Sequence, residues 1–408
     1  MRVVQKYGGT SVADAERVKH VAARIAERKK KGDEVIVVVS AMGNRTDELI
    51  ALARSINPSP PARELDLLLS TGEQAASALL AMALNAIGQD AVGLSGRQTG
   101  IISKQRFGDG RISRIEEGKI EEVLARGAIP IIAGFQGITE TDEIVTLGRG
   151  ASDLTAVALS IALKADSCET FKDVEGVFSA DPRVVKNAKK IKEIGYEEML
   201  EMATQGSQVM HSRAIELAAA YNMPIRVASS MNTASGTLIH GGNVMEERNR
   251  VRGVVGDMDV AKITLRSLPD EPGIAVRIFE PLAAAAISVD TIVQNASEER
   301  LTDLTFTIAE SDLEAAEAIM PEICEKVRAS GYVADARLAK VSIVGAGIQS
   351  EPGYAAQMFK ALYRAGINIE MISTSEIRLT CIVSKEHLDE AVEALHKEFV
   401  SEFDKKND

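Results

Sequence analysis

An internal repeat in the last third of the chain restricts its fold more than any other feature. The segment AKITL around Lys262 resembles AKVSI around Lys340, 78 positions later. A Pro-Gly pair follows each segment, and ISVD ending at Asp290 then matches INIE ending at Glu370, 80 positions later. Each copy reads as a strand, a Pro-Gly turn, a helix, a strand, its hairpin partner and a second helix. An ordered series of matches at nearly constant spacing predicts two copies of one small α/β module.

Residues 1 to about 240 alternate short β-branched runs with longer helical patterns. The run VIVVV at 35–39 is apolar throughout, as in a strand that is buried on both faces of a parallel sheet. Apolar residues from 18 to 25 share one helical face, and Asp14 is expected to cap that helix. This alternation predicts an αβα sandwich around a mostly parallel sheet. Further strands are expected at 2–5, 91–94, 129–132, 167–171 and 225–228, helices at 72–87 and 153–164, and a proline-rich loop at 55–61.

The length of 408 residues predicts two or three domains. Residues 241–259 are polar and rich in glycine, and we interpret them as the junction before the repeats. The formal net charge of −12 argues against a nucleic-acid or anionic-membrane surface. No signal-like segment or run long enough to span a bilayer is evident, and the three cysteines lack metal-site spacing. We therefore expect a cytoplasmic protein with reduced thiols and without a metal-ligand cluster.

The segment KYGGTS lies between the first strand and the first helix. Gly8 and Gly9 would let a phosphate chain approach the backbone closely. Lys6 would supply the positive charge that a transferring phosphoryl group requires. An ordinary glycine turn beside a surface lysine is the alternative for this motif alone. The chain contains no GxxxxGK[ST] sequence, which excludes a P-loop enzyme.

Three further polar segments are expected to follow strands or open helices, where α/β proteins place their ligands. They are SAMG at 40–43 with TDE at 46–48, STGEQ at 70–74, and GRGASD at 148–153. In the last of these, Arg149 can grip a carboxylate with two hydrogen bonds. Taken singly, Asp153 could be only a helix cap, and Glu73 only an acid that complements a helix dipole.

Six motifs, in order and at compatible spacing, resemble those of the aspartokinase family: KYGGTSV, VVSAMG, STGEQ, LGRGxSDxTA, DVxGVxxADPR and STSEIR. The repeats resemble a pair of ACT domains. The resemblance covers essentially the whole chain. It implies an amino acid kinase αβα sandwich at 1–245, followed by two ferredoxin-like βαββαβ ACT domains at 260–335 and 336–408.

The resemblance also implies an activity. The γ-phosphate of ATP, with Mg²⁺, would pass to the β-carboxylate of L-aspartate and give 4-phospho-L-aspartate. This is the first step of lysine, threonine, methionine and diaminopimelate synthesis. Another kinase of the same fold, for glutamate or uridylate, is an alternative that the repeats and STSEIR disfavour. A catalytically dead amino-acid sensor is a second alternative, which the retained lysine, glycines, arginine and aspartate disfavour.

Carried over position by position, the resemblance implies a set of site residues. The catalytic residues are Lys6 and Asp153, and the ATP-binding residues are Lys6, Gly8, Gly9, Ser40, Lys172, Asp173, Asp181 and Arg183. Aspartate would contact Thr46, Glu73, Arg149, Ser152 and Asp153. Two departures from the family pattern are Ala151, where a glycine is usual, and Gln208, where a lysine is frequent. We interpret His211 as a structural histidine with satisfied hydrogen bonds.

The repeats are expected to bind lysine or threonine as an inhibitor, in loops that edge-to-edge pairing brings against a neighbouring strand. The expected effector-binding residues are Asp270, Gly273, Ala275, Asp290, Gln294, Asn368 and Ile369. The assembly would be a homo-oligomer, or a complex with a shorter C-terminal copy that begins at Met245. The alternative is that the polar residues only end strands and mediate dimerisation.

Overall fold

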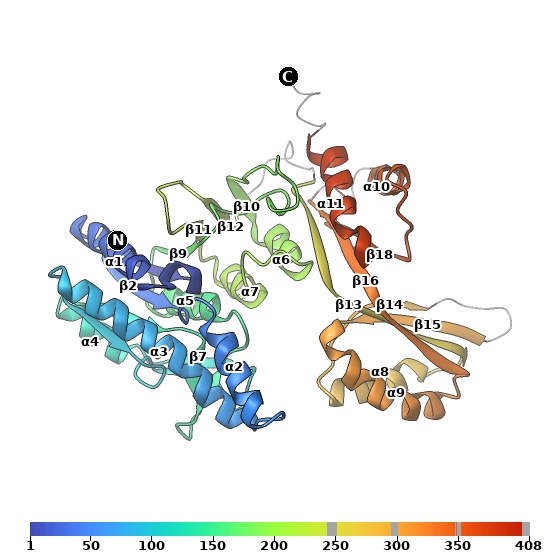
Figure 1. The fold of residues 1–408 in the computed structure, drawn as a ribbon, viewed down its shortest axis with the longest axis horizontal. Coiled ribbons are helices and arrows are strands. Elements are labelled where there is room, and N and C mark those ends of the chain that lie inside the picture. The colour runs from blue at the N-terminus through green and yellow to red at the C-terminus, as the bar shows by residue number, and fades with distance from the viewer. Residues whose placement is uncertain (243–250, 295–300, 347, 349–351, 402–408) are drawn as a thin grey trace. The chain divides into compact units, whose positions relative to one another are not determined.

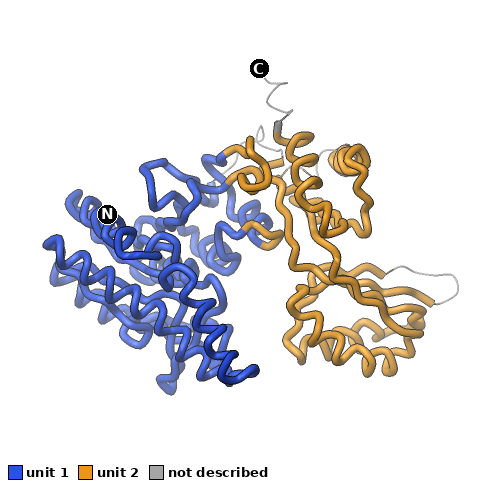
Figure 2. Tube along the Cα trace, viewed as in Figure 1, with its two compact units in different colours: residues 1–177, 190–203, 208–244 blue, residues 178–189, 204–207, 245–408 orange. Residues whose placement is uncertain are grey.

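The computed structural model describes residues 1–242, 251–294, 301–346, 348 and 352–401. The chain divides into two compact units (Figure 2). The first contains residues 1–177, 190–203 and 208–244, and the second contains 178–189, 204–207 and the part from 245 onward. The chain therefore passes from the first unit into the second at residues 178–189 and then returns to the first. Met245, named in the sequence interpretation, lies outside the described residues.

The described strands of the first unit form an eight-stranded sheet in the order β10-β12-β11-β9-β1-β2-β6-β3 (Figure 1). All neighbours are parallel except β11 and β12. Its strands are β1 (Arg2–Tyr7), β2 (Glu34–Val39), β3 (Ala91–Leu94), β6 (Ile129–Ala133), β9 (Ser167–Lys172), β10 (Glu193–Gly195), β11 (Ile225–Ser229) and β12 (Thr237–His240). A smaller sheet contains β5 (Arg111–Ile115), β4 (Ile101–Lys104), β7 (Gln136–Ile138) and β8 (Ile144–Thr146).

Helices cover both faces of the large sheet, which confirms the αβα sandwich. The helices are α1 (Ala15–Lys30), α2 (Arg45–Ile56), α3 (Ala62–Ala86), α4 (Gly118–Ala125), α5 (Ser152–Ala162), α6 (Tyr196–Thr204) and α7 (Ser212–Tyr221). Asp14 caps α1 as predicted, accepting the N–H of Arg17 at 2.9 Å. Tyr7 packs into the core with α1 and α3. Because side chains alternate along a strand, Lys6 points to the opposite face, which α5 covers.

The prediction that α3 begins at residue 72 is wrong. The helix begins ten residues earlier, at Ala62, and STGEQ lies in its middle instead of in a loop. Glycine usually marks a helix end, but Gly72 is there for space: a Cβ at this position would lie 2.9 Å from the Cβ of Ala41. By length and composition α3 is the one described helix that could cross a membrane, and half of its most apolar window is buried, as in a core helix.

The second unit contains a six-stranded sheet in the order β14-β15-β13-β16-β18-β17. Its elements follow the predicted repeat: β13 (Gly253–Pro269), α8 (Ile274–Ala284), β14 (Val289–Gln294), β15 (Leu301–Ile308), α9 (Leu313–Val327), β16 (Gly331–Val344), α10 (Tyr354–Arg364), β17 (Met371–Thr374), β18 (Arg378–Ser384) and α11 (Leu388–His396). The interpretation of 241–259 as a junction is wrong for its last residues. Residues 253–257 pair with 340–344 along the side of β16 that β18 does not occupy, and so extend the sheet of the second repeat.

Two ion pairs join the repeats at equivalent positions. Lys340 of the second repeat reaches Asp290 of the first at 2.9 Å, and Lys262 of the first reaches Glu370 of the second at 3.1 Å. Lys340 is 7% exposed and also lies 3.5 Å from Asp257. The two repeats therefore contribute strands to one continuous sheet and are joined by ion pairs.

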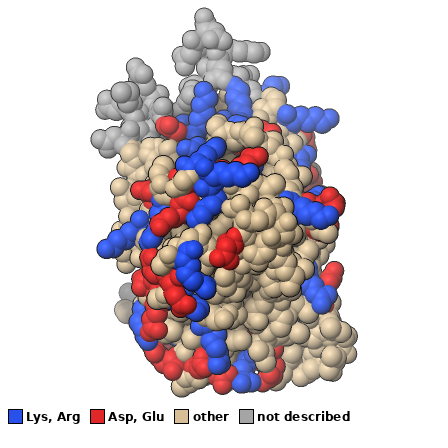
Figure 3. All heavy atoms as spheres, turned by 90° about the vertical axis from the view of Figure 1, so that its left-hand side faces the viewer, with Lys and Arg blue, Asp and Glu red and all other residues tan. Residues whose placement is uncertain are grey.

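The charges of the surface are mixed. On the face drawn in Figure 3, Lys and Arg side chains are interspersed with Asp and Glu side chains, beside a broad uncharged area.

Candidate active site

Two lysines meet one carboxylate at the carboxyl end of the parallel strands. The Nζ of Lys6, from β1, lies 2.7 Å from Oδ1 of Asp153, and the Nζ of Lys172, from β9, lies 2.9 Å from Oδ2. Strands β1 and β9 are neighbours, and Asp153 is the second residue of α5. Lys6 and Asp153 are 5% and 2% exposed. The sequence analysis named all three residues, and the structure brings them together.

Burial and charge act in opposite directions on this cluster. Burial alone would raise the pKa of Asp153, but Lys172 and Lys6 outweigh it and hold the pKa well below its usual range. Burial lowers the pKa of Lys6, although Asp153 opposes this effect. Two lysines facing one carboxylate at the edge of a parallel sheet favour an anionic ligand there.

Glycines allow the loops after β1 and β2 to pack closely against each other. A Cβ on Gly9 would lie 2.5 Å from the carbonyl oxygen of Ala41, and the N–H of Gly43 donates to the oxygen of Gly9 at 3.0 Å. Gly8 is buried, and its N–H donates to the backbone carbonyl oxygen of Phe171 at 3.0 Å. This N–H is therefore already hydrogen-bonded within the protein. The expected close approach of a phosphate therefore depends on Gly9 and on Lys6 more than on the N–H of Gly8.

Glu73 is a buried carboxylate with one unsatisfied oxygen. It projects from the middle of α3, and its Oε1 accepts the N–H of Ala41 at 3.0 Å. Its Oε2 is buried without a hydrogen-bond partner among the described residues. Burial raises the pKa of Glu73 to about 7. An oxygen of this kind is suited to accept a hydrogen bond from a ligand cation.

The loop that opens α5 presents Arg149 to the solvent. Gly148 and Gly150 adopt positive φ angles of 96° and 79°, which glycine adopts without strain. Arg149 is exposed and donates to Asp47 at 2.5 Å. Ala151, where the family usually has glycine, has a φ of −72°, so the alanine is accommodated without strain.

Comparisons with known proteins identify the family. The amino acid kinase family profile matches residues 1–229, and ACT domain profiles match 263–325 and 341–399. The aspartokinase of Corynebacterium glutamicum is 46% identical over 402 residues, which is 97% of this chain and 96% of that protein. The chain belongs to the aspartokinase family. The predicted family, fold class and enzyme class, an aspartate kinase, are thereby confirmed.

Two solved structures of an aspartokinase extend the comparison. Aspartokinase III of E. coli in complex with aspartate and ADP has a TM-score of 0.82 and 26% identity, covering 98% of this chain and 99% of that one. The same enzyme in complex with lysine and aspartate has a TM-score of 0.71 at the same identity and coverage. The binding of ADP to that relative supports the use of ATP by this aspartokinase.

The remaining predicted site residues of this aspartokinase are more dispersed. Ser152 packs against the backbone of the loop after β6: a Cβ on Gly134 would lie 2.9 Å from its side chain. Ser40 and Thr46 are half-buried, after β2 and on α2, and Asp173 is exposed after β9. Asp181 and Arg183 belong to the second unit, where they pair with each other at 2.6 Å.

His211 lies beside the cluster, where the sequence analysis did not place it. Its backbone N–H donates to Oδ2 of Asp153 at 3.4 Å, and its ring lies beside Gly150. The expectation that its hydrogen bonds are satisfied is not met at Nδ1, which is buried without a hydrogen-bond partner among the described residues. Burial lowers the pKa of His211. The motif GSQVMHSR before α7, similar to a frequent family motif, was the signal that could have identified it.

The predicted effector residues lie on equivalent loops and edge strands of the two repeats. Gly273 and Gly353 precede α8 and α10 with φ angles of 92° and 113°. Asp270, Ala275 and Gln294 are exposed, and Asp290 is paired with Lys340. Asn368 donates to Glu370 at 3.3 Å, and Ile369 packs against the core of the second repeat. Residues 349–351 of the second loop lie outside the described residues.

Proposed function

We propose that this chain transfers the γ-phosphoryl group of ATP to the β-carboxylate of L-aspartate, which gives 4-phospho-L-aspartate. The buried Lys6–Asp153–Lys172 cluster carries this proposal. A free aspartate side chain has a pKa near 3.9 and is ionised at pH 7, so the reaction needs no general base. Its obstacle is repulsion between anions, about 4 kcal/mol for unit charges about 4 Å apart at an effective dielectric constant of about 20. The two lysines would offset this repulsion.

Within the cluster, the residues would have different roles. Lys6 and Lys172 would bind the phosphate oxygens and stabilise the charge that develops during transfer. Asp153 would hold both ammonium groups in place, because its two oxygens are already occupied by them. Glu73 would accept the α-ammonium group of aspartate, and Arg149 its α-carboxylate.

Mg²⁺ is proposed as part of the nucleotide. Among the described residues, no group of three or more His, Cys, Asp or Glu side chains is arranged to hold a metal ion. Mg²⁺ keeps several waters and is often held mainly by substrate phosphates, so a site without a protein cage fits it. When bound, the ion would neutralise phosphate charge.

Trapping of the product tests this proposal. Acyl phosphates react with hydroxylamine to give hydroxamates, whereas phosphate esters do not. We expect aspartate hydroxamate to form only when enzyme, ATP and L-aspartate are all present. If glutamate or uridylate replaces aspartate without loss of ADP release, the chain is instead another kinase of the same fold.

The pKa of Glu73 predicts a pH dependence for substrate binding. Below about pH 7 this carboxyl is protonated, so it loses its attraction for an ammonium group. The KM for aspartate should therefore rise as the pH falls from 8 to 6, approaching about tenfold per unit, while the KM for ATP stays nearly constant. Glu73→Gln should give a high KM that is independent of pH over this range. Glu64→Gln, an exposed change on the same helix, is the control, and an unchanged pH profile in Glu73→Gln would contradict the assignment.

Arg149→Ala is expected to raise the KM for aspartate by about tenfold, because an exposed charged hydrogen bond is lost. The KM for ATP should stay within twofold. Asp47→Asn, which removes the present partner of Arg149, should leave the KM for aspartate unchanged or lower it. Steady-state kinetics with each substrate varied in turn separates these effects. A rise in the KM for ATP alone would assign Arg149 to the nucleotide.

We propose that the enzyme catalyses the first step of lysine, threonine and methionine synthesis, in the cytoplasm. We propose further that lysine or threonine binds to the repeats and inhibits it. Support comes from the solved complex of E. coli aspartokinase III with lysine. Further support comes from the exposed loops before α8 and α10. A homo-oligomer, or a complex with a shorter C-terminal copy, would pair the open edge strands β14 and β17.

Gln294→Ala tests the effector site. Gln294 is exposed at the end of edge strand β14, remote in sequence from every proposed catalytic residue. We expect uninhibited activity to stay almost unchanged and the inhibiting concentration of the effector to rise several-fold, within the usual range of allosteric coupling. If neither lysine nor threonine, alone or together, inhibits the parent enzyme, the feedback assignment is wrong.

A further inference from the structure

The segment 178–189 contains two proposed ATP-binding residues but is built into the core of the second repeat. Ala180 and Val185, 3% and 4% exposed, belong to the apolar cluster formed with α10, α11, β16 and β18. The N–H of Val254, on β13, donates to the oxygen of Ser179 at 2.8 Å. The chain enters this segment from Val177 and leaves it at Lys190, both in the first unit. A nucleotide loop is thus packed as part of the regulatory unit.

One buried hydrogen bond ties the segment to the last helix. The Ser179 hydroxyl and Nε2 of His396, at the end of α11, are 2.9 Å apart. The same hydroxyl accepts the N–H of Lys189 at 2.8 Å, and the N–H of Ser179 donates to the oxygen of Lys189 at 2.8 Å. Ser179 and His396 are 3% and 1% exposed. The Ser179 side chain therefore joins the two ends of the segment to each other and to His396 of α11.

The two proposed nucleotide residues lie on a turn between these anchors. The N–H groups of Val184 and Val185 donate to the backbone carbonyl oxygen of Asp181 at 3.0 and 2.8 Å. Asp181 accepts from the N–H and the guanidinium of Arg183, and this pairing lowers its pKa. Arg183 is 83% exposed. The turn that carries Arg183 thus lies between two anchored residues, Ser179 and Val185.

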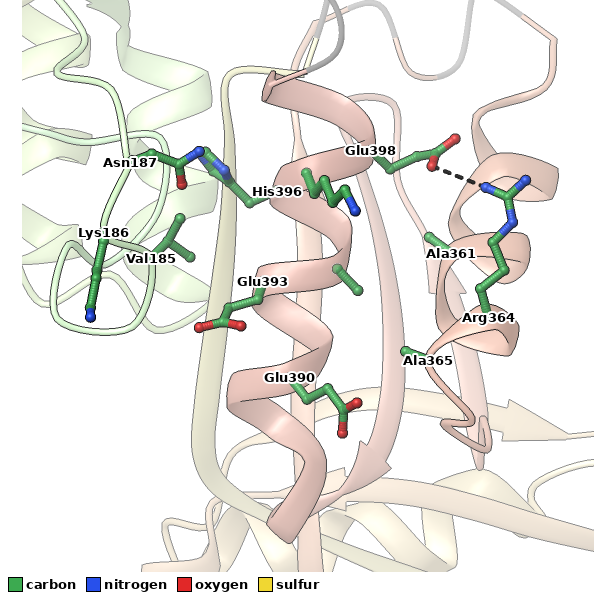
Figure 4. A pocket seen from close by; sticks show the side chains of 12 residues that line it. Val185, Lys186, Asn187, Ala361, Arg364, Ala365, Glu390, Glu393, His396 and Glu398 are labelled. Atoms are coloured by element: carbon green, nitrogen blue, oxygen red, sulfur yellow. Dashed lines mark ion pairs between the residues drawn. The ribbon is translucent and has the colours of Figure 1, made fainter.

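A cavity separates part of the segment from the helices. It has a volume of about 720 Å³ and is lined by Val185, Lys186 and Asn187 on one side and by α10 and α11 on the other. Figure 4 shows His396 pointing from α11 toward the segment, at one end of this cavity. Because the space beside Lys186 and Asn187 is not filled by side chains, this part of the segment is held less by packing than Ala180 is, and the Ser179–His396 hydrogen bond contributes more to its position.

We propose that His396 is a positioning residue for the nucleotide. Through Ser179 it fixes the segment 178–189, so the second repeat sets the orientation of the turn that carries Asp181 and Arg183. This inference rests on the proposed transfer from ATP and on the role in ATP binding that the family resemblance implies for that turn. A displacement of α11 then changes ATP binding and leaves aspartate binding unchanged. A purely structural histidine would stabilise the repeat without distinguishing the two substrates.

The test compares variants at both ends of the hydrogen bond. Ser179→Ala and His396→Leu should each raise the KM for ATP by roughly three- to tenfold, as expected for one buried hydrogen bond, with the KM for aspartate within twofold. The double variant should show no more than the larger single effect, because the two residues share one interaction. His396→Gln, whose amide can reach the hydroxyl, should recover most of the loss. Glu393→Gln, on the same helix and cavity, is the control.

Two results would overturn the inference. One is an unchanged KM for ATP in Ser179→Ala and His396→Leu, and the other is an equal rise in both KM values with a lower melting temperature. Arg183→Ala separates this inference from the proposed function beneath it. If Arg183→Ala leaves the KM for ATP unchanged, the turn does not bind ATP. If it raises that KM while Ser179→Ala does not, only the role of His396 is wrong.

Discussion

Lys6→Met is expected to lower kcat by a factor of about 10²–10³ and to change the KM for aspartate little. Lys6 is buried, and its ammonium group lies at the carboxyl end of β1 against Asp153. A fixed charge at this place stabilises the phosphoryl group most strongly as it transfers, and loss of one such group typically costs this much. Methionine keeps the length and most of the volume of the side chain, so the change removes mainly the charge.

The measurement is steady-state turnover with both substrates varied. Lys19→Met is a matched control, because Lys19 lies on α1 and is exposed beside Glu16. It should retain the activity of the parent. Near-full turnover in Lys6→Met would show that the phosphate site has been placed wrongly, whatever happens to the KM values.

Asp153→Asn is expected to lower the free energy of unfolding by about 3–5 kcal/mol, because it removes the counter-charge of two lysines in a buried site. The double variant Lys6→Met with Asp153→Asn should lose less than the sum of the two single variants, because it no longer buries an unpaired ammonium at position 6. Urea unfolding at pH 7 measures both effects. A loss below about 1 kcal/mol in Asp153→Asn would mean that water or a nearby group already compensates the lysines.

The direction of the pKa shift gives a second test of Asp153. Its pKa in the folded protein is lower than in the unfolded chain, so the unfolded chain binds its proton more tightly. The stabilisation is therefore fully present above about pH 4, the ordinary range of this carboxyl, and is lost as the pH falls through the lower folded value. The stability difference between the parent and Asp153→Asn should shrink in strong acid.

The sequence predicted the residues whose position follows from the ends of strands. Lys6 and Lys172 are at the ends of neighbouring strands, and Asp153 opens a helix, so the parallel sheet places all three at one edge. Gly72 was misinterpreted as the boundary of a helix. In a sequence, a glycine that makes room for Ala41 cannot be told from a glycine at a helix boundary. Only the contact distinguishes these two cases.

Other errors arose where tertiary contacts decide the structure. Residues 253–257 end a polar, glycine-rich stretch, yet they form a strand because β16 offers them a partner 83 to 91 positions along the chain, with Gly253 opposite Val344 and Asp257 opposite Lys340. His211 precedes a helix of ordinary composition, and only the fold brings its N–H to Asp153. Local sequence also gives no sign that Asp181 and Arg183 belong to the second unit, because the partner residues Val254 and His396 are far away in the chain.

Release of ADP by the purified chain tests the central claim most directly. With ATP and Mg²⁺ present, we expect rapid release of ADP that depends on L-aspartate and saturates with its concentration. Without aspartate, or with glutamate or uridylate in its place, release should stay near the background of the Lys6→Met variant. A parent enzyme that releases no more ADP with aspartate than without it would contradict the account, and would identify the chain as a sensor that has kept the fold of a kinase.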